Sequence, residues 1–522
     1  MKKFLSVIIA IVLTLSLTIP AFAAETYSIT IENNVEGHTY EAYQIFKGDL
    51  HGKVLSNIVW GSGQSNHTVG SDAKDAAAAL TTADENTTTE ENAEKLSQEL
   101  TLTTPSGSTS TLTAEGTYVI SGLEPGYYLI KDADSSLNNK DEAYTKFIVK
   151  IVGDATAKPK SSKPTVDKQV LDEFEDRDTA SKDGWGETAD HAINEIFQYK
   201  LIANIPNEKN IEAYKQYKLI FHDTMSAGIT FDSIESVIVT DASNQSTAIN
   251  IKDDTNVNGY EYTVEVSDNG ITSLTLTVAD LLKVINNIRG AKVEVIYNAH
   301  LNRNAEVGAE GNNTNKVYLE YSNNPNVSGE GDTGKTPEDI VWVFTLLMDN
   351  TKIDGETKNP LAGAGFRLYN ATTKAEIPLI FDTEKNAYRP VADGEESEEM
   401  FSAEGTGKFD IIGLDAGSYT LKETTVPGGY NKCDDIELKL DAVHSDVPTD
   451  PNKATCTITK WQYNKETQDF DATNTFTIEN NKGAELPETG GIGTVIFYVI
   501  GGVLVAGAVI VLITRKRMAA EK

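Results

Sequence analysis

Hydrophobic and polar residues alternate in short runs over most of this chain. Period-two alternation places successive side chains on opposite faces of a β-strand. Turn-forming Gly, Asn, Asp and Pro separate the runs, which is typical of β-sandwich proteins. We therefore predict an all-β fold of tandem Ig-like β-sandwich domains. The clearest runs cover residues 27–31, 146–151, 293–297 and 317–321.

Three segments depart from this pattern. Residues 71–100 are rich in Ala, Glu and Thr, and they predict one or two helices inserted in the first domain. Residues 153–164 and 323–337 lack apolar periodicity and are rich in turn formers, so they predict linkers. The linkers divide the chain into an N-terminal domain at 24–160, a middle domain at 161–337 and a third domain at 338–483.

The N-terminus has the pattern of a signal peptide at residues 1–23. Lys2 and Lys3 precede an uncharged stretch, which ends at the small-residue site Ala21-Phe22-Ala23. This order of basic, apolar and small residues directs a chain to export and cleavage. We predict a secreted protein.

The C-terminus combines three features in residues 484–522. An uncharged stretch at 492–513 would span roughly 33 Å as a helix, which is enough to cross a bilayer. Arg515-Lys516-Arg517 follows and favours a cytoplasmic end. Before the stretch stands the pentapeptide Leu486-Pro487-Glu488-Thr489-Gly490.

This arrangement resembles the cell-wall sorting signal of Gram-positive surface proteins. The resemblance implies that a sortase cleaves between Thr489 and Gly490 and transfers the Thr489 carbonyl to an amine. It also implies that membrane anchoring is transient and that the mature protein loses its transmembrane helix.

Composition argues against several classes of function. The chain has 522 residues and a formal net charge of -33, which argues against nucleic-acid binding because phosphate contacts need Lys and Arg. Its seven histidines follow no metal-binding spacing, and no nucleophile or phosphate-loop motif occurs. We expect a structural or binding protein without metal or cofactor, and not an enzyme. Export permits a disulfide between Cys433 and Cys456, but their spacing does not require one.

The chain also repeats one motif. Residues 122–132 match residues 413–423, and both read as a turn followed by a strand that ends on an acid. Period two places Tyr419, Leu421 and Glu423 on the inner face. A buried carboxyl is costly unless it is paired or protonated. A buried Lys and a buried Asn beside the acid would explain why the carboxyl is there. The neutral Lys amine could attack the Asn amide, release ammonia and form an isopeptide bond.

The third domain contains these parts in order: Lys352 near its start, Glu423 within it and Asn480 at its end. It resembles the CnaB-type domains of sortase-assembled pilins, with a Tyr-x-Leu-x-Glu-Thr run followed by Pro-Gly-Gly-Tyr. The resemblance implies a Lys352–Asn480 isopeptide bond with Glu423 as its catalytic acid. In the first domain Asp132 replaces this Glu, and we expect no isopeptide there.

The middle domain is similar to the CnaA-like domain of major pilins. By that similarity Lys168 would be the amine and Asp223 the catalytic acid. We predict Asn323 as the amide, while Asn315 has the same strand parity and Asn324 is adjacent, so both stay open.

Major pilins use a Lys in a Pro-Lys motif before the second domain as the polymerising amine. Lys160 matches best, with Lys158 and Lys163 as alternatives. The resemblance implies a backbone pilin joined from Thr489 to Lys160 of the next copy by a class C sortase. A housekeeping sortase would attach the fibre, with its accessory pilins, to peptidoglycan on a Gram-positive cell, where the pilus supports adhesion. The alternative is a monomeric wall-anchored adhesin that binds host matrix.

Overall fold

The computed structural model of the chain is mostly β. It describes residues 25–80, 89–108, 110, 112–134, 136–137, 142–158, 163–172, 183–208, 211, 214–311, 313–325, 332–444, 453–483 and 492–520. These residues form two compact units. One holds the chain up to residue 346 with residues 413–416 and 441–458, and the other holds residues 347–412, 417–440 and 459 onward.

Two small sheets build the N-terminal part of the first unit. Their strand orders are β4-β1-β7 and β3-β2-β5-β6. Ile29 and Ile31 of one sheet share a core with Tyr128 and Ile130 of the other, so the two layers pack face to face. The strands are β1 (Tyr27–Ile31), β2 (Tyr40–His51), β3 (Val54–Trp60), β4 (Tyr118–Leu123), β5 (Gly126–Asp132), β6 (Lys146–Ile151) and β7 (Ala155–Ala157).

Two helices cover the second face of the β2–β5 sheet. They are α2 (Lys74–Ala79) and α3 (Thr89–Glu99), inside the segment where the sequence predicts helices. Ala77 of α2 joins a separate core with Phe46 and Trp60. This face needs such a cover because every residue of β5 is buried. The predicted helical insertion is confirmed.

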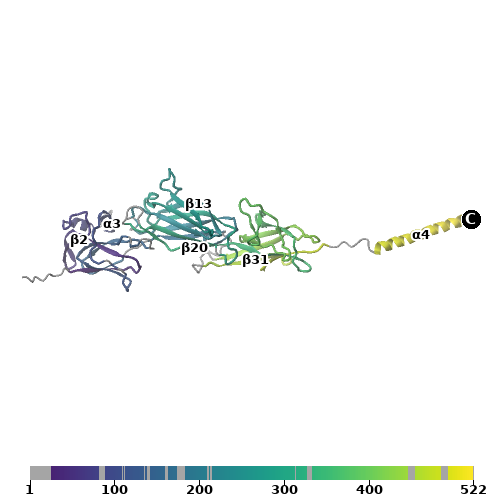
Figure 1. The fold of residues 1–522 in the computed structure, drawn as a ribbon, viewed down its shortest axis with the longest axis horizontal. Helices are drawn as coiled ribbons and strands as arrows, with labels where there is room; N and C mark the ends of the chain where they lie inside the picture. Colours follow the sequence, from purple (N-terminus) through teal and green to yellow (C-terminus); the bar gives the residue numbers. More distant parts are fainter. Residues whose placement is uncertain are drawn as a thin grey trace, which may run out of the picture. The chain divides into compact units, whose positions relative to one another are not determined.

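The middle part is a sandwich of two larger sheets (Figure 1, teal). One sheet has the order β10-β20-β18-β12-β16-β15 with β19 beside β18, and the other has the order β14-β13-β17-β11-β8-β9. Strand β17 alternates strictly between partly and fully buried residues, as period two requires. Val295 of one sheet and Leu319 of the other belong to one core, so the predicted sandwich is confirmed.

The elements of this sandwich are β8 (Thr165–Leu171), β9 (Trp185–Gly186), β10 (Thr188–Asp190), β11 (Ile196–Asn204), β12 (Leu219–Met225), β13 (Ile229–Thr240), β14 (Ser246–Ala248), β15 (Tyr260–Val266), β16 (Thr272–Val278), the 3-10 helix η3 (Leu281–Lys283), β17 (Lys292–Leu301), β18 (Asn313–Ser322), β19 (Thr333–Lys335) and β20 (Asp339–Phe344).

The C-terminal β-structure contains three sheets. Their orders are β21-β28-β26-β25, β22-β33 and β24-β23-β29-β30-β31-β32, with β27 beside β23. The strands are β21 (Leu346–Met348), β22 (Asn350–Asp354), β23 (Gly365–Asn370), β24 (Glu376–Ile377), β25 (Leu379–Asp382), β26 (Ala387–Pro390), β27 (Met400–Phe401), β28 (Ile411–Leu414), β29 (Gly417–Thr425), β30 (Ile436–His444), β31 (Cys456–Asn464), β32 (Asp469–Thr473) and β33 (Phe476–Asn480).

The repeated motif begins with the same glycine conformation in both places. Gly122 and Gly413 adopt φ angles of 80° and 78°, a left-handed conformation that Gly tolerates best. Each precedes a strand, β5 or β29, that carries the acid of the motif. In β29 the inward residues are those that period two predicts.

Both predicted linkers contain a short strand that the sequence did not indicate. β7 pairs with β1 in parallel, and β19 pairs with β18. Each has only three residues, which is too short for a recognisable alternation. The last helix is α4 (Ile492–Ala520), and its segment 496–518 is long and apolar enough to cross a membrane, with a mean hydropathy of 2.8.

Candidate functional site

The third domain brings its predicted Lys, Glu and Asn together in its core. β22 carries Lys352 and pairs in parallel with β33, which carries Asn480. Lys352 Nζ donates to Asn480 Oδ1 at 2.7 Å, and Asn480 Nδ2 donates to Glu423 Oε1 at 2.7 Å. All three side chains are buried.

The surroundings of this triad favour a neutral amine. Burial lowers the pKa of Lys352, while nearby Cys433 and Glu423 oppose that shift. The Cys433 backbone amide donates to Glu423 Oε2 at 2.8 Å and fixes the carboxyl against Asn480. The amine thus lies beside the amide it would attack, and a carboxyl that can transfer protons lies on the other side.

The middle domain contains a second buried lysine pair. Lys168 of β8 contacts Asp223 of β12 across the two sheets. Tyr297 of β17 completes the group, because its hydroxyl accepts from Lys168 Nζ at 3.0 Å and donates to Asp223 Oδ1 at 3.1 Å. Burial lowers the pKa of Lys168 and raises the pKa of Asp223, and their mutual attraction opposes both shifts. The neutral amine and neutral acid are therefore favoured relative to water.

Asn315, rather than Asn323, lies beside this pair. Asn315 Nδ2 donates to the Tyr297 hydroxyl at 2.6 Å, and Asn315 Oδ1 is buried without a hydrogen-bond partner. Asn315 pairs with Met225 in the sheet, two residues from Asp223 on the same face. The structure thus favours one of the two open alternatives over the predicted residue.

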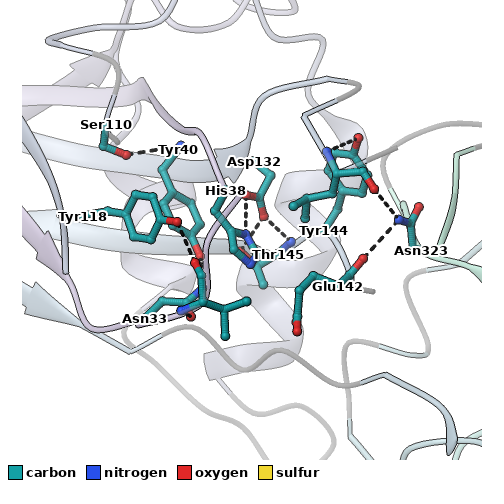
Figure 2. Close-up of polar contacts among 12 residues, drawn as sticks. Asn33, His38, Tyr40, Ser110, Tyr118, Asp132, Glu142, Tyr144, Thr145 and Asn323 are labelled. Carbon is teal, nitrogen blue, oxygen red and sulfur yellow. Dashed lines mark hydrogen bonds and ion pairs between the residues drawn. The ribbon is translucent and has the colours of Figure 1, made fainter. Parts of the chain in front are cut away.

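Asn323 has a different role in the fold. Its side-chain amide donates to the carbonyls of Leu137 and Glu142, each at 3.1 Å. Figure 2 shows the contact with Glu142. Its own carbonyl accepts from the Tyr144 amide at 2.7 Å. Asn323 follows the end of β18 by one residue, so it lies roughly 26 Å along an extended chain from Asn315. Asn324 is also engaged elsewhere, with Asp332 at 3.1 Å.

In the first domain the acid of the repeat has other partners. Asp132 Oδ1 contacts His38 Nδ1 at 2.8 Å, and Asp132 Oδ2 accepts from the Thr145 amide at 2.8 Å (Figure 2). Both Asp132 and His38 are buried. The carboxyl is satisfied here by an imidazole and a backbone amide, in place of the Lys and Asn of the third domain.

Several predicted site residues lie outside the described part of the chain. These are the signal peptide, Lys160 and the pentapeptide Leu486–Gly490. The structure describes the two alternatives to Lys160. Lys158 follows β7 and is exposed. Lys163 is also exposed, and its Nζ donates a hydrogen bond to Glu142 Oε1 at 2.8 Å.

Both cysteines are free thiols in the structure. Burial raises the pKa of the Cys433 thiol to about 11 and that of the Cys456 thiol to about 12. Sequence reasoning missed the role of the Cys433 backbone and of Tyr297. An inward Tyr on an alternating strand is the signal for Tyr297, but the same pattern describes ordinary core residues.

Three family models match the chain. A Gram-positive pilin backbone subunit model, described as a Cna-B-like domain, matches residues 193–325, where the sequence suggested a CnaA-like domain. A prealbumin-like fold domain matches residues 348–452, and the LPXTG cell wall anchor motif matches residues 478–519. The chain is thus a cell-wall-anchored surface pilin related to the backbone subunits of Gram-positive pili.

The chain is also similar to individual proteins. The chain is 25% identical over 422 residues to the trypsin-resistant surface T6 protein of Streptococcus pyogenes, covering 70% of this chain and 71% of that protein. The solved T6 backbone pilin of Streptococcus pyogenes shares the fold, with a TM-score of 0.50 and 18% identity over 88% of this chain and 99% of the other. The full-length major pilin SpaD of Corynebacterium diphtheriae gives a TM-score of 0.43 and 18% identity over 88% and 98% of the two chains.

Proposed function

We propose that this pilin is a covalent backbone subunit with an internal isopeptide bond in each of its second and third domains. The observation that carries the proposal is the buried Lys352–Asn480–Glu423 contact, in which amine, amide and acid lie within hydrogen-bond distance. The linkers suggest domains at residues 24–160, 161–337 and 338–483, but β20 (Asp339–Phe344) packs in the middle sandwich, so we place the last boundary after residue 344.

The reaction needs only the three side chains. The neutral Lys352 amine attacks Asn480 Cγ. Protonated Glu423, which contacts Asn480 Nδ2, gives its proton to this departing nitrogen, which leaves as ammonia, and the carboxylate then takes the proton that the Lys352 nitrogen loses. One amide bond replaces another, and each domain reacts once, so the reaction is self-modification and the chain has no enzymatic turnover.

The same reaction in the middle domain would join Lys168 to Asn315, with Asp223 as the acid. Burial shifts the pKa values of Lys168 and Asp223 in the directions that the reaction needs. Tyr297 would hold both the amide and the acid, because its hydroxyl contacts Asn315 and Asp223.

Between subunits we propose a bond from the Thr489 carbonyl to Lys160 of the next copy. A class C sortase would form it, and a housekeeping sortase would join the last subunit to peptidoglycan. Accessory pilins would attach to the same fibre. The family match to the LPXTG anchor motif supports the Thr489 end. For the lysine that accepts the acyl group, Lys160 and Lys158 are better candidates than Lys163, because Lys163 Nζ is hydrogen-bonded to Glu142.

Intact-mass measurement of the chain without its two terminal signals tests the internal bonds. Each bond removes one ammonia, so two bonds make the protein about 34 Da lighter than its sequence. A mass equal to that of the unmodified sequence contradicts both bonds.

Replacing Asn315 with Ala is expected to leave only one mass loss, of about 17 Da, because the middle domain then lacks its amide. Asn323→Ala is the matched control, since it removes an Asn near the end of the same strand and should keep both losses. If Asn323→Ala shows only one mass loss and Asn315→Ala keeps both, Asn323 is the amide of the middle domain. Peptide mapping by mass spectrometry identifies the bonded pair directly.

A further inference from the structure

A second cluster of ionisable side chains is buried in the first unit, and it shares no residue with the lysine pairs. Asp172 follows β8, Asp190 ends β10 and His444 ends β30. Their exposed fractions are 6%, 1% and 2%. All three belong to the same compact unit, which includes residues 441–458.

The three side chains converge on one point. His444 Nε2 lies 3.1 Å from Asp172 Oδ2 and 3.1 Å from Asp190 Oδ1. The three ligand atoms all lie within 4.8 Å of one another. Ligand atoms bound to a tetrahedral zinc ion are separated by roughly 3.3 Å, given bond lengths of about 2.0–2.1 Å. Two of the three separations are therefore close to those of a zinc site.

Hydrogen bonds around the cluster orient the side chains as metal ligands are oriented. His444 Nδ1 lies 2.7 Å from the Thr188 hydroxyl, and an Nδ1–H that donates to it leaves the Nε2 lone pair facing the carboxylates. The second oxygen of Asp190 accepts from the Ala416 amide at 2.8 Å and fixes that carboxylate. A lone pair that faces two anionic oxygens needs a cation between them.

A proton is the first possible cation, but it fits this geometry poorly. A single Nε2–H would have to be shared between two carboxylate oxygens that lie equally close, and a shared hydrogen bond is well aligned with neither acceptor. A metal ion at the centre contacts all three atoms at once. The mixed nitrogen and oxygen set suits zinc or a similar first-row ion, whereas calcium and magnesium prefer oxygen ligands alone.

We propose that Asp172, Asp190 and His444 bind one divalent transition-metal ion, best fitted by zinc, with water completing the coordination. The ion would be structural, because it would join Asp190 to a residue 254 positions later in the chain. Sequence spacing cannot reveal such a site, since His444 lies 254 positions after Asp190 in the chain.

Zinc content tests this proposal. The full chain in detergent, free of any affinity tag, is stripped with EDTA, equilibrated with zinc chloride, desalted and analysed by plasma mass spectrometry. We expect about one zinc ion per chain, and zinc at 100-fold above its Kd should raise the melting temperature of this unit by roughly 5 °C. Cobalt in place of zinc should give the visible absorption of a four-coordinate ion.

Variants locate the site. His444→Gln and Asp190→Asn should each lower the zinc content to background. His300→Ala is the control, because His300 also contacts an aspartate, Asp232, at 2.9 Å, but on the surface. A wild-type chain with no bound zinc overturns the proposal whatever the variants do. Stoichiometric zinc in both His444→Gln and Asp190→Asn overturns the assignment to these ligands.

Discussion

Replacing Glu423 with Gln is expected to leave the third domain without its crosslink and to lower its melting temperature by roughly 10–20 °C. Gln fills the same space but cannot accept and return a proton, so Lys352 and Asn480 remain separate. The crosslink closes a loop of 128 positions, and a loop of about 100 residues contributes close to 5 kcal/mol by restricting the unfolded chain. Mass spectrometry and calorimetry of the same sample measure both effects.

The matched control for this variant is Glu479→Gln. Glu479 neighbours Asn480 on β33, but it is exposed and pairs with Lys358 at the surface at 2.7 Å. Exposed ion pairs contribute about 0–1 kcal/mol, so this change should leave the mass loss and the melting temperature almost unaltered. If Glu423→Gln still loses ammonia at the normal rate, Glu423 is not the catalytic acid.

Lys160→Ala is expected to abolish polymerisation. Without that amine the acyl-enzyme formed at Thr489 has no pilin acceptor, and the ladder of SDS-resistant high-mass species in cell-wall extracts should collapse to the monomer. The monomer should still reach the wall, because the housekeeping sortase uses a peptidoglycan amine. Immunoblots of wall and membrane fractions measure both results.

Lys158→Ala and Lys163→Ala are the controls for this experiment. Both remove a lysine from the same linker, and both should leave the ladder intact. Lys163→Ala additionally breaks the contact with Glu142, so it tests whether that contact matters for assembly. A ladder that survives Lys160→Ala but disappears in Lys158→Ala would move the assignment to Lys158. A parent strain without any ladder would favour the monomeric adhesin.

The fold could be predicted because alternation is a local signal. Strands β1 and β6 have the bounds that the hydrophobic pattern indicates, and the inner face of β29 follows from period two alone. The short strands β7 and β19 could not be predicted, since three residues with no apolar alternation pair only because the neighbouring sheet offers a free edge.

The lysine sites were predictable where residue order fixes their place. Lys352 lies on a strand near the start of its domain and Asn480 on the last strand, and these two strands pair directly. The middle domain was harder, because Asn315 in β18 and Asn323 just after it have the same parity along the chain. Only the register with β12, which places Asn315 two residues from Asp223, distinguishes them. That register is a tertiary property that the sequence does not show.

The parallel pairing of β22 with β33 has a mechanical consequence for a fibre under load. The chain enters the third domain next to Lys352 and leaves it next to Asn480, so a pull along the fibre would shear these two strands. With a covalent bond between the two side chains, the load passes directly across it. Residues 353–479, which would otherwise add roughly 430 Å of extended length, stay outside the loaded path. The pilus would then extend very little under load, because the interior of the domain carries none of the force.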